Sequence, residues 1–547
     1  MRRYFIPAVC FVVFIVFLVY RPALNNGFVN WDDDVHLLEN PFVQGLDPQH
    51  LRDIFTTTVN KIYLPLTSLS FAVEYHVVGD RPFLYHFTNV ALHAAVTAMA
   101  VFFCLRLGLS LAGSVVAALL FGLHPMHVES VAWVTERKDV LYSFFYLGAL
   151  LCYCGYLKNP KGGFLFLTFV LGFLSVLAKP MAMSLPLVLA VLDWYFKRRL
   201  SAGSLIEKAA LGLLFLPVVW MTYSLQMRHI HFEFPQSLLM GVWTFTFSLQ
   251  KFLWPDYFVL LYQVPKPVSL IQPAYLQAVA VFIVLVLGMM VFRRRRVFYF
   301  SILFYAASVF FLVRFDQAAD ANMVADRFMY LPSLGVCALL GRIFEKFFLS
   351  LSGHRHLQGM LAGLLALGYA GLAFKTTEQI GVWRSGVSLW SHQLQKQGTV
   401  ATALIYNKLA EATVAEDAFQ RILDHPPGGK EWPGDLSAEQ MDMVNKVITL
   451  YESALRIKPD YATAYRNLGS LYLEAGDWGR AEEYLSQAVS FDPKDFEAFF
   501  QLGQLRLRQG RRAEAAVAFQ QAVNINLDNR RLIRRIEKIL ASSDERP

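Results

Sequence analysis

Residues 5–41 read "FIPAVCFVVFIVFLVYRPALNNGFVNWDDDVHLLENP", and this stretch joins an apolar run directly to three consecutive aspartates. The run 5–20 is close to the length that a helix needs to cross a bilayer. No small-residue cleavage site follows it, so we expect a membrane anchor and not a signal peptide. Asp32, Asp33 and Asp34 repel one another and need water or a positive partner. The sequence therefore predicts an acidic loop just outside a membrane.

The composition extends this prediction to most of the chain. Of the 547 residues 55% are hydrophobic and only 17% are charged, whereas soluble proteins carry about 25% charged residues. Apolar runs dominate to about residue 375, and the sequence then becomes charged and periodic. We expect an all-α protein with a polytopic membrane domain (1–375), a connector with a partial repeat and an insertion (376–440), and a helical-repeat domain (441–547).

Apolar runs of suitable length predict eleven crossings. The run 238–254 is ambiguous, and we interpret it as a re-entrant or interfacial helix because a full crossing would reverse the charge pattern around it. The helix count near 238–272 stays open. The expected crossings are 5–20, 87–105, 107–123, 140–157, 163–178, 180–196, 209–226, 273–292, 297–313, 328–344 and 357–374.

The positive charges set the orientation, because lysine and arginine concentrate in cytoplasmic loops. With the amino terminus in the cytoplasm, the basic clusters at 197–199 and 293–296 also fall inside. The net charge of +8 then reflects orientation, and we expect no nucleic-acid partner. All five cysteines lie in apolar runs, so disulfides are not expected. The loops expected on the outer face, with the soluble domain, are 21–86, 124–139, 227–272 and 314–327.

The soluble part repeats with a period of 34 residues. Leu468 and Leu502, and Gly469 and Gly503, are each 34 apart, which is the spacing of tetratricopeptide repeats. An earlier partial unit, "YNKLAEA" (406–412), is followed by an insertion containing "HPPGGKEWPGD". The concave face of such an array binds peptides, although a structural cap or a dimer contact is an alternative.

The outer loops carry the residues that suggest chemistry. The aspartate triplet is either a solvated turn or a source of a general base. In "HPMHVESVAWVTERKD" (124–139), His124, His127 and Glu129 have the chemistry of a metal site, but their spacing fits no zinc pattern. Arg137 and Lys138 suit either a lipid phosphate or ordinary headgroup contact.

Two further positive charges lie outside against the orientation rule. Lys179 and Arg327 would be explained by a shared anionic ligand, such as a phosphate held by several cations. His86, Asn89 and His93 share one face of the second crossing, where a ligand cavity and a packed helix contact are both compatible with the pattern.

These segments together resemble a known family. The stretches "FVNWDDDVHLLENP" (28–41), "YLPLTSLSFAVEY" (63–75), "YHFTNVALHA" (85–94), "HPMHVESVAWVTERKDVL" (124–141) and "ADRFMYLPSLG" (325–335), with the repeats, are similar to the transmembrane and tetratricopeptide-repeat-containing O-mannosyltransferases and their bacterial relatives. That family lies in the GT-C superfamily of membrane glycosyltransferases.

The resemblance implies a sugar transferase that uses a polyprenyl-phosphate donor and an extracytoplasmic acceptor. Asp32 would be the base with Asp33 as its support, although the triplet makes the choice between them uncertain by one residue. Arg137, Lys138, Lys179 and Arg327 would bind the donor phosphate. No cofactor is then obligatory, and a divalent metal is not expected. Further residues expected to contact substrate are Asn40, His93, His124, His127, Glu129, Asp326 and Tyr330.

Several readings stay open at this stage. The acceptor is either Ser/Thr of a protein, docked on the repeats, or a lipid or surface glycan. An oligosaccharyl ligase with a diphosphate-linked donor and a non-catalytic membrane scaffold are the rivals. A transporter is disfavoured, since no inverted repeat is apparent in the hydropathy. We expect an integral protein of a bacterial inner membrane, with the endoplasmic reticulum as the alternative.

Overall fold

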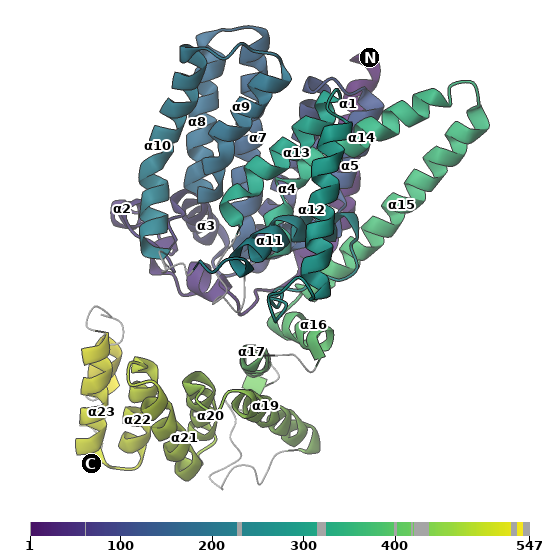
Figure 1. Cartoon of the computed structure of the whole chain (residues 1–547). Helices are drawn as coiled ribbons and strands as arrows, with labels where there is room; N and C mark the ends of the chain where they lie inside the picture. The colour runs from purple at the N-terminus through teal and green to yellow at the C-terminus, as the bar shows by residue number, and fades with distance from the viewer. Residues whose placement is uncertain are drawn as a thin grey trace. The chain divides into compact units, whose positions relative to one another are not determined.

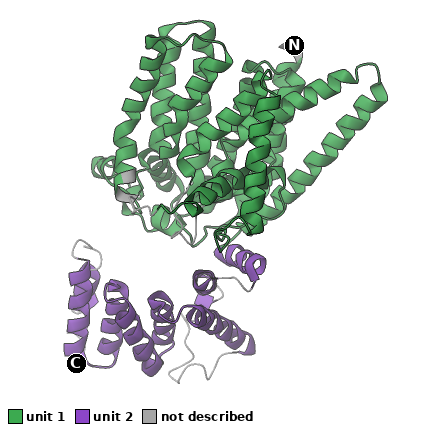
Figure 2. Cartoon of the chain, in the orientation of Figure 1, with its two compact units in different colours: residues 1–385 green, residues 386–547 purple. Residues whose placement is uncertain are grey.

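The computed structural model describes residues 2–60, 62–226, 232–313, 324–398, 402–416, 419–420, 437–526 and 533–539. The chain divides into two compact units, residues 1–385 and 386–547 (Figure 2). Regular structure in the described residues is helical, apart from one isolated bridge between Val59 and Ile62. The expected all-α class is therefore confirmed. The division lies after Ser385 and not after residue 375, because the last helix of the first unit continues to Val382.

Unit 1 is a bundle of long apolar helices with shorter helices at one end (Figure 1). Several of these helices begin with proline, because the first N–H groups of a helix have no partner within the helix and proline lacks one. Their bounds are α1 Arg2–Tyr20, α2 Pro48–Thr56, α3 Pro65–Val78, α4 Pro82–Arg106, α5 Leu111–Gly122, α6 Val128–Ala132, α7 Arg137–Lys158, α8 Gly162–Ala178, α9 Leu185–Tyr195, α10 Ala202–Gln226, α11 Gln236–Leu253, α12 Pro273–Val291, α13 Arg296–Val309, α14 Ser333–Ser350 and α15 Arg355–Val382.

Six helical segments of the described chain are long and apolar enough to cross a membrane. A seventh is obtained if α5 and the segment Pro125–Ala132, which bend by 52° at their junction, form one broken span. Three more apolar helices are shorter, and α11 is not among the six. Membrane helices are thus present, but the expected count of eleven crossings is not confirmed. The six are Tyr4–Asn25, Pro82–Arg106, Val134–Lys158, Ala202–Thr222, Pro273–Val291 and Arg355–Val382.

Small residues let the helices of unit 1 approach closely. A Cβ atom on Gly341 of α14 would overlap the carbonyl oxygen of Gly113 on α5 and crowd Ala117. Such contacts bring backbones together in lipid, where there is no hydrophobic driving force between helices. The helix α7 packs against both α4 and α8, so it is a central element of the bundle.

The stretch 21–86, expected as a loop, contains α2 and α3. Its apolar side chains form a small core of their own, in which Leu37, Ile54 and Phe71 pack with Tyr85 of α4 and Val134. This core holds the aspartate segment against the residues that precede α7. The loop is therefore a folded part of unit 1.

Unit 2 consists of paired antiparallel helices, as the repeat spacing predicted. A Cβ on Gly469 would meet Leu485, and one on Gly503 would meet Phe519, so glycine is required where two helices of a repeat touch. The expected partial unit lies in α17, which packs on α19. The insertion with "HPPGGKEWPGD" lies outside the described residues. The helices are α16 Gly386–Gln397, α17 Ala403–Val414, α19 Ala438–Ile457, α20 Ala462–Glu474, α21 Trp478–Phe491, α22 Phe496–Arg508 and α23 Arg512–Ile525.

Candidate active site

The aspartate loop is clamped to the segment before α7. The two side-chain oxygens of Asp33 accept hydrogen bonds from the backbone N–H groups of Val29, at 2.9 Å, and Thr135, at 3.1 Å. Nearby, the indole N–H of Trp133 donates to the carbonyl oxygen of Trp31 at 3.1 Å. Asp33 is only 1% exposed, and this burial raises its pKa to about 7. Its geometry is that of a support for the loop.

Asp32 differs from Asp33 in its backbone conformation, its exposure and its hydrogen bonding. Its backbone has φ = +63°, in the left-handed region that aspartate tolerates better than most residues and that is enriched at functional sites. Its side chain is partly exposed. No hydrogen bond or ion pair engages the Asp32 carboxylate in the described part of the chain, and it lies within electrostatic reach of Lys138. Of the two acids, Asp32 is the one left available.

Three cations from three separate elements converge on one carboxylate. Glu136 lies 3.0 Å from the ammonium of Lys138, 3.5 Å from that of Lys179 and 3.3 Å from Nε of Arg327. Lys138 belongs to α7, Lys179 follows α8, and Arg327 lies in the short helix η8 (Asp326–Met329). Their side chains are 9–13% exposed, so the cluster is nearly closed. We call Lys138, Lys179 and Arg327 the cation cluster.

The cation cluster is balanced by carboxylates. Asp139 pairs with Lys179 at 2.5 Å, and Glu129 pairs with the Arg327 guanidinium and also accepts its backbone N–H. With Glu136, three carboxylates therefore face three cations. Glu136 and Asp139 were not predicted as site residues, although the run "TERKD" signals such alternation of charge.

Trp133 joins the cation cluster to the aspartate loop. The Lys138 ammonium and the Arg327 guanidinium each lie 5.6 Å from its ring centroid, within cation–π range. Its other contacts are the stacked ring of Trp383, at 5.3 Å, and the carbonyl of Trp31. Trp133 was not predicted as a site residue. Trp133 thus contacts two members of the cation cluster through its ring and the backbone of the aspartate loop through its N–H group.

Arg137 does not belong to the cation cluster, contrary to the sequence prediction. Its guanidinium is 0% exposed and donates to Asn89 at 2.7 Å, to the Glu74 carboxylate at 2.5 Å and to the carbonyl oxygen of Tyr85 at 2.7 Å. These partners lie on α3 and α4, so Arg137 anchors α7 to its neighbours. This geometry supports an anchoring role, and the expected contact of Arg137 with the donor phosphate stays a prediction.

The predicted substrate histidines are likewise engaged in packing. His93 contacts the Tyr330 hydroxyl at 2.7 Å and the Gly122 carbonyl at 3.0 Å. His127 contacts the Phe121 carbonyl at 2.7 Å and the Ser333 hydroxyl at 3.1 Å. In both rings the two nitrogens have protein partners. The structure therefore places His93, His127 and Tyr330 in a buried contact between α4, the α5–α6 bend and the start of α14.

The remaining predicted residues also have internal partners. His124 bonds the Phe252 carbonyl at 2.9 Å and accepts the Met126 N–H, while Asn40 caps the short helix that begins at Pro41. The Tyr262 hydroxyl donates to Asp326 at 2.8 Å, and burial beside Glu129 raises the pKa of Asp326. Tyr262 had no sequence signal. In the described residues, no group of three His, Cys, Asp or Glu side chains is placed to hold a metal ion.

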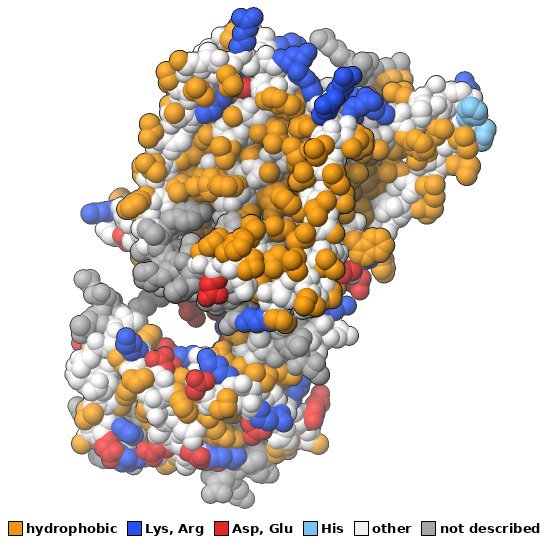
Figure 3. Space-filling view, in the orientation of Figure 1, with side chains coloured by type: hydrophobic (Ala, Val, Ile, Leu, Met, Phe, Trp, Pro, Cys, Tyr) orange, Lys and Arg blue, Asp and Glu red, His pale blue; other side chains and the backbone are white. Residues whose placement is uncertain are grey.

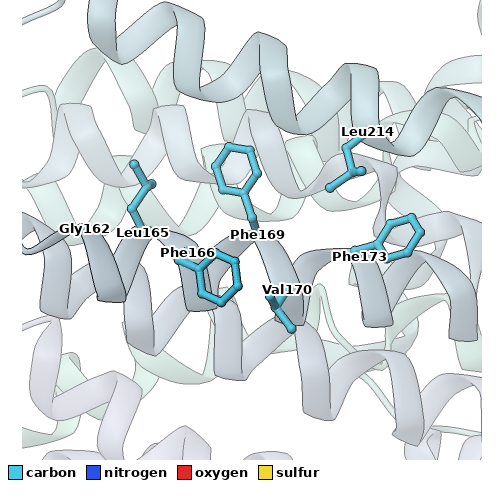
Figure 4. Close-up of a pocket in the computed structure, with 7 residues that line it drawn as sticks. All are labelled: Gly162, Leu165, Phe166, Phe169, Val170, Phe173 and Leu214. Carbon is cyan, nitrogen blue, oxygen red and sulfur yellow. The ribbon is translucent and has the colours of Figure 1, made fainter.

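An apolar groove lies between α8, the helix that precedes Lys179, and α10. Its lining is almost entirely hydrocarbon (Figure 4). A groove of this chemistry accommodates an acyl or isoprenoid chain. It is lined by Gly162, Leu165, Phe166, Phe169, Val170, Phe173 and Leu214.

Comparison with known proteins bears out the resemblance inferred from the motifs. The tetratricopeptide repeat family matches residues 443–502 and 472–536. The chain is 24% identical over 605 residues to mouse protein O-mannosyl-transferase TMTC3, covering 95% of this chain and 64% of that protein. It is 27% identical over 413 residues to the Caenorhabditis elegans protein O-mannosyl-transferase F38B6.6, covering 69% of this chain and 56% of the relative.

One relative that matches over a shorter stretch has a higher sequence identity. The Drosophila melanogaster protein O-mannosyl-transferase Tmtc1 is 34% identical over 187 residues, covering 33% of this chain and 22% of the relative. Among solved structures, the crystal structure of ArnT from Cupriavidus metallidurans bound to undecaprenyl phosphate aligns with a TM-score of 0.35 and 14% identity, over 94% of this chain and 75% of that one. The chain spans about 64% of the length of mouse TMTC3.

Proposed function

We propose that this protein is a membrane glycosyltransferase that moves a hexose, such as mannose, from a polyprenyl-phosphate donor to a hydroxyl group of an extracytoplasmic acceptor. The proposal is carried by one observation: the loop that presents the available Asp32 carboxylate is bonded to Trp133, whose ring also contacts Lys138 and Arg327 of the cation cluster. The long similarity to protein O-mannosyl-transferases supports the class of reaction.

The proposed reaction is a single displacement with inversion at the anomeric carbon. Asp32 takes the proton of the acceptor hydroxyl as its oxygen bonds to the anomeric carbon. The bond between that carbon and the phosphate oxygen breaks, and its electron pair leaves with polyprenyl phosphate. Asp33 keeps Asp32 in place through its bonds to the backbone of Val29 and Thr135.

The cation cluster stabilises the negative charge that grows on the leaving phosphate. Lys138, Lys179 and Arg327 are held in position by their carboxylate partners, so little reorganisation is required. Since the leaving group is already a phosphate monoester, we propose that no metal is obligatory. The isoprenoid would lie between helices, and the apolar α8–α10 groove, lined along α8 from Gly162 to Phe173, is a suitable place for it.

The location and acceptor complete the proposal. We assign the protein to a bacterial inner membrane, with its amino terminus in the cytoplasm and the aspartate loop, the cation cluster and the repeats on the outer side. Ser/Thr of a protein docked on the repeats is the acceptor that we favour, because tetratricopeptide arrays bind peptides on their concave face.

The first experiment measures donor consumption by the full chain in lipid nanodiscs, using a panel of radiolabelled polyprenyl-phosphate hexoses. Asp32→Asn should reduce turnover by about 100-fold or more, which is the usual effect of removing a general base. Asp34→Asn is the matched control, because it removes a neighbouring aspartate whose carboxylate bonds only its own loop, at Val35 N–H.

Equal activity of the two variants would overturn the role of Asp32, and no consumption of any donor by folded wild-type protein would overturn the proposed function. Adding either a peptide extract or a glycan extract separates the two acceptor classes. Turnover with the glycan alone would reassign the acceptor and leave the donor chemistry in place.

A further inference from the structure

A strongly basic surface lies at the other end of unit 1, away from the aspartate loop. It comprises two connections: Lys197 to Arg199, between α9 and α10, and Arg293 to Arg296, between α12 and α13. Figure 3 shows Lys and Arg side chains gathered along this edge, beside a broad apolar surface. The proposed reaction uses none of these residues.

The two connections are neighbours in space. The guanidinium of Arg296 donates to the carbonyl oxygen of Tyr195 at 3.0 Å, and the rings of Trp194 and Tyr299 lie 6.0 Å apart. The end of α9 and the start of α13 are therefore in contact. The two connections, which carry seven cations, therefore lie next to each other.

Most of these charges are not neutralised by the protein. Arg198 makes a bidentate pair with Glu207, at 2.6 and 2.8 Å, and the nearby Asp193 is paired with Lys208. In the described part of the chain no ion pair involves the six others, whose side chains are all exposed. We call these six the basic patch: Lys197, Arg199, Arg293, Arg294, Arg295 and Arg296.

The surroundings of the basic patch select the kind of ligand. It directly follows α12, a candidate span whose side chains are mostly exposed, and directly precedes α10, another candidate span. Trp194, Phe196 and Phe292 are 42%, 38% and 48% exposed at the same level. Aromatic side chains beside cations at the end of a span mark the headgroup region of a bilayer.

We propose that the basic patch binds the headgroup phosphate of an anionic glycerophospholipid. Arginine recognises phosphate with two parallel N–H groups, and several cations beside a membrane helix attract anionic lipids. The acyl chains would lie on the exposed surface of α12 and the aromatic side chains beside it. The site is separate from the donor site and does not depend on the proposed reaction.

The test measures lipid retention by the full chain with native mass spectrometry. The protein is reconstituted in nanodiscs with equal amounts of phosphatidylglycerol and phosphatidylcholine that carry the same acyl chains, and is then released. Wild type should retain phosphatidylglycerol at least tenfold over phosphatidylcholine. Arg294→Gln/Arg295→Gln should bring this retention close to equality between the two lipids, because each cation near a membrane surface contributes about 1 kcal/mol, or about fivefold.

Lys158→Gln/Lys161→Gln is the matched control. It removes two exposed lysines from the α7–α8 connection, and it should leave the retention unchanged. An equal loss of phosphatidylglycerol retention in both double variants would overturn the proposal. It would show that the lipid responds to the overall positive charge and not to a specific site. Absence of headgroup preference in wild type would overturn it as well.

A third arm separates a lipid from a free phosphate. Soluble glycerol phosphate at millimolar concentration should not displace phosphatidylglycerol from wild type, because it lacks the acyl chains. Complete displacement would show that the basic patch binds phosphate without the membrane and would overturn the lipid assignment. Thermal unfolding of each variant, expected to match wild type because the changed residues are exposed, verifies that all are folded.

Discussion

Removing the Arg137 guanidinium should destabilise the protein without changing its affinity for the donor. In Arg137→Gln the Glu74 carboxylate, only 8% exposed, loses its cation. Breaking a buried pair in this way costs about 3–5 kcal/mol. The bonds to Asn89 and Tyr85 are lost as well, at about 1 kcal/mol each, but bonds that share one side chain are not additive. We expect a loss of 3–5 kcal/mol, a large part of the 5–15 kcal/mol that holds most native proteins folded.

The assay combines thermal unfolding in nanodiscs with donor KM. Arg137→Gln and Glu74→Gln should both lower the unfolding temperature by several degrees. The apolar double variant Arg137→Met/Glu74→Leu should regain part of this loss, because no buried charge is left alone. Arg52→Gln, a change of the same kind at an exposed arginine of α2, is the control and should unfold like wild type.

One result would refute this reasoning. If Arg137→Gln unfolds at the wild-type temperature and its donor KM rises tenfold or more, the guanidinium contacts the donor and the anchoring role is wrong. A loss of stability with unchanged donor KM in the surviving folded protein would confirm the anchoring role. The two outcomes differ in both readouts.

Three further predictions test other parts of the structure. Lys179→Gln and Arg327→Gln should each lower kcat by about 100-fold, as loss of one donor to a developing oxyanion does; single-turnover rates check this, and unchanged rates would remove the residue from the site. Because the pKa of Asp33 is raised to about 7, the folded protein holds a proton that the unfolded chain releases near pH 4, so stability should fall as pH rises from about 4 to about 7; Asp33→Asn should flatten unfolding temperature against pH in that window, and an unchanged slope would contradict the assignment. Gly503→Val should unfold unit 2, since the added atoms meet Phe519; a normal far-ultraviolet melting curve of the full chain would show that the helices can separate without cost.

The sequence predicted the residues of the cation cluster, but it could not show which cations of α7 point toward the cluster and which point toward other helices. Lys138 and Arg137 are adjacent in sequence, yet successive residues of a helix point about 100° apart. One therefore reaches the cluster while the other faces α3 and α4. Only the packing of α7 decides which cation is available.

The substrate contacts expected of the histidines stay a prediction, and the sequence could not show their packing role for a different reason. His93, His124 and His127 each bond one backbone carbonyl oxygen, and no sequence pattern identifies such a partner. Tyr262 lies far from Asp326 in sequence, so the sequence does not indicate the contact between them. Polar residues in an apolar helix indicate burial, but not whether a ligand or the protein itself satisfies them.

The apolar pattern located the helices better than it counted the crossings. A helix stands at the position of each expected span, but several are shortened by the bends at Pro125 and Pro180. Proline breaks the hydrogen-bond ladder without interrupting the hydrophobic run. The first outer loop gave no such periodic signal, and its helices α2 and α3 were missed.

The equal number of cations and carboxylates around Glu136 has a consequence for turnover. A phosphodiester donor brings one negative charge to a cluster whose charges already cancel, whereas the phosphate monoester that leaves carries nearly two at neutral pH. In the proposed reaction the cations stabilise this added charge as it develops, while the carboxylates beside them limit how tightly the departing phosphate is then held. An excess of lysine and arginine would hold the product tightly and slow the next cycle. In the proposed reaction, the acidic side chains beside the cations thus determine how quickly the carrier lipid leaves.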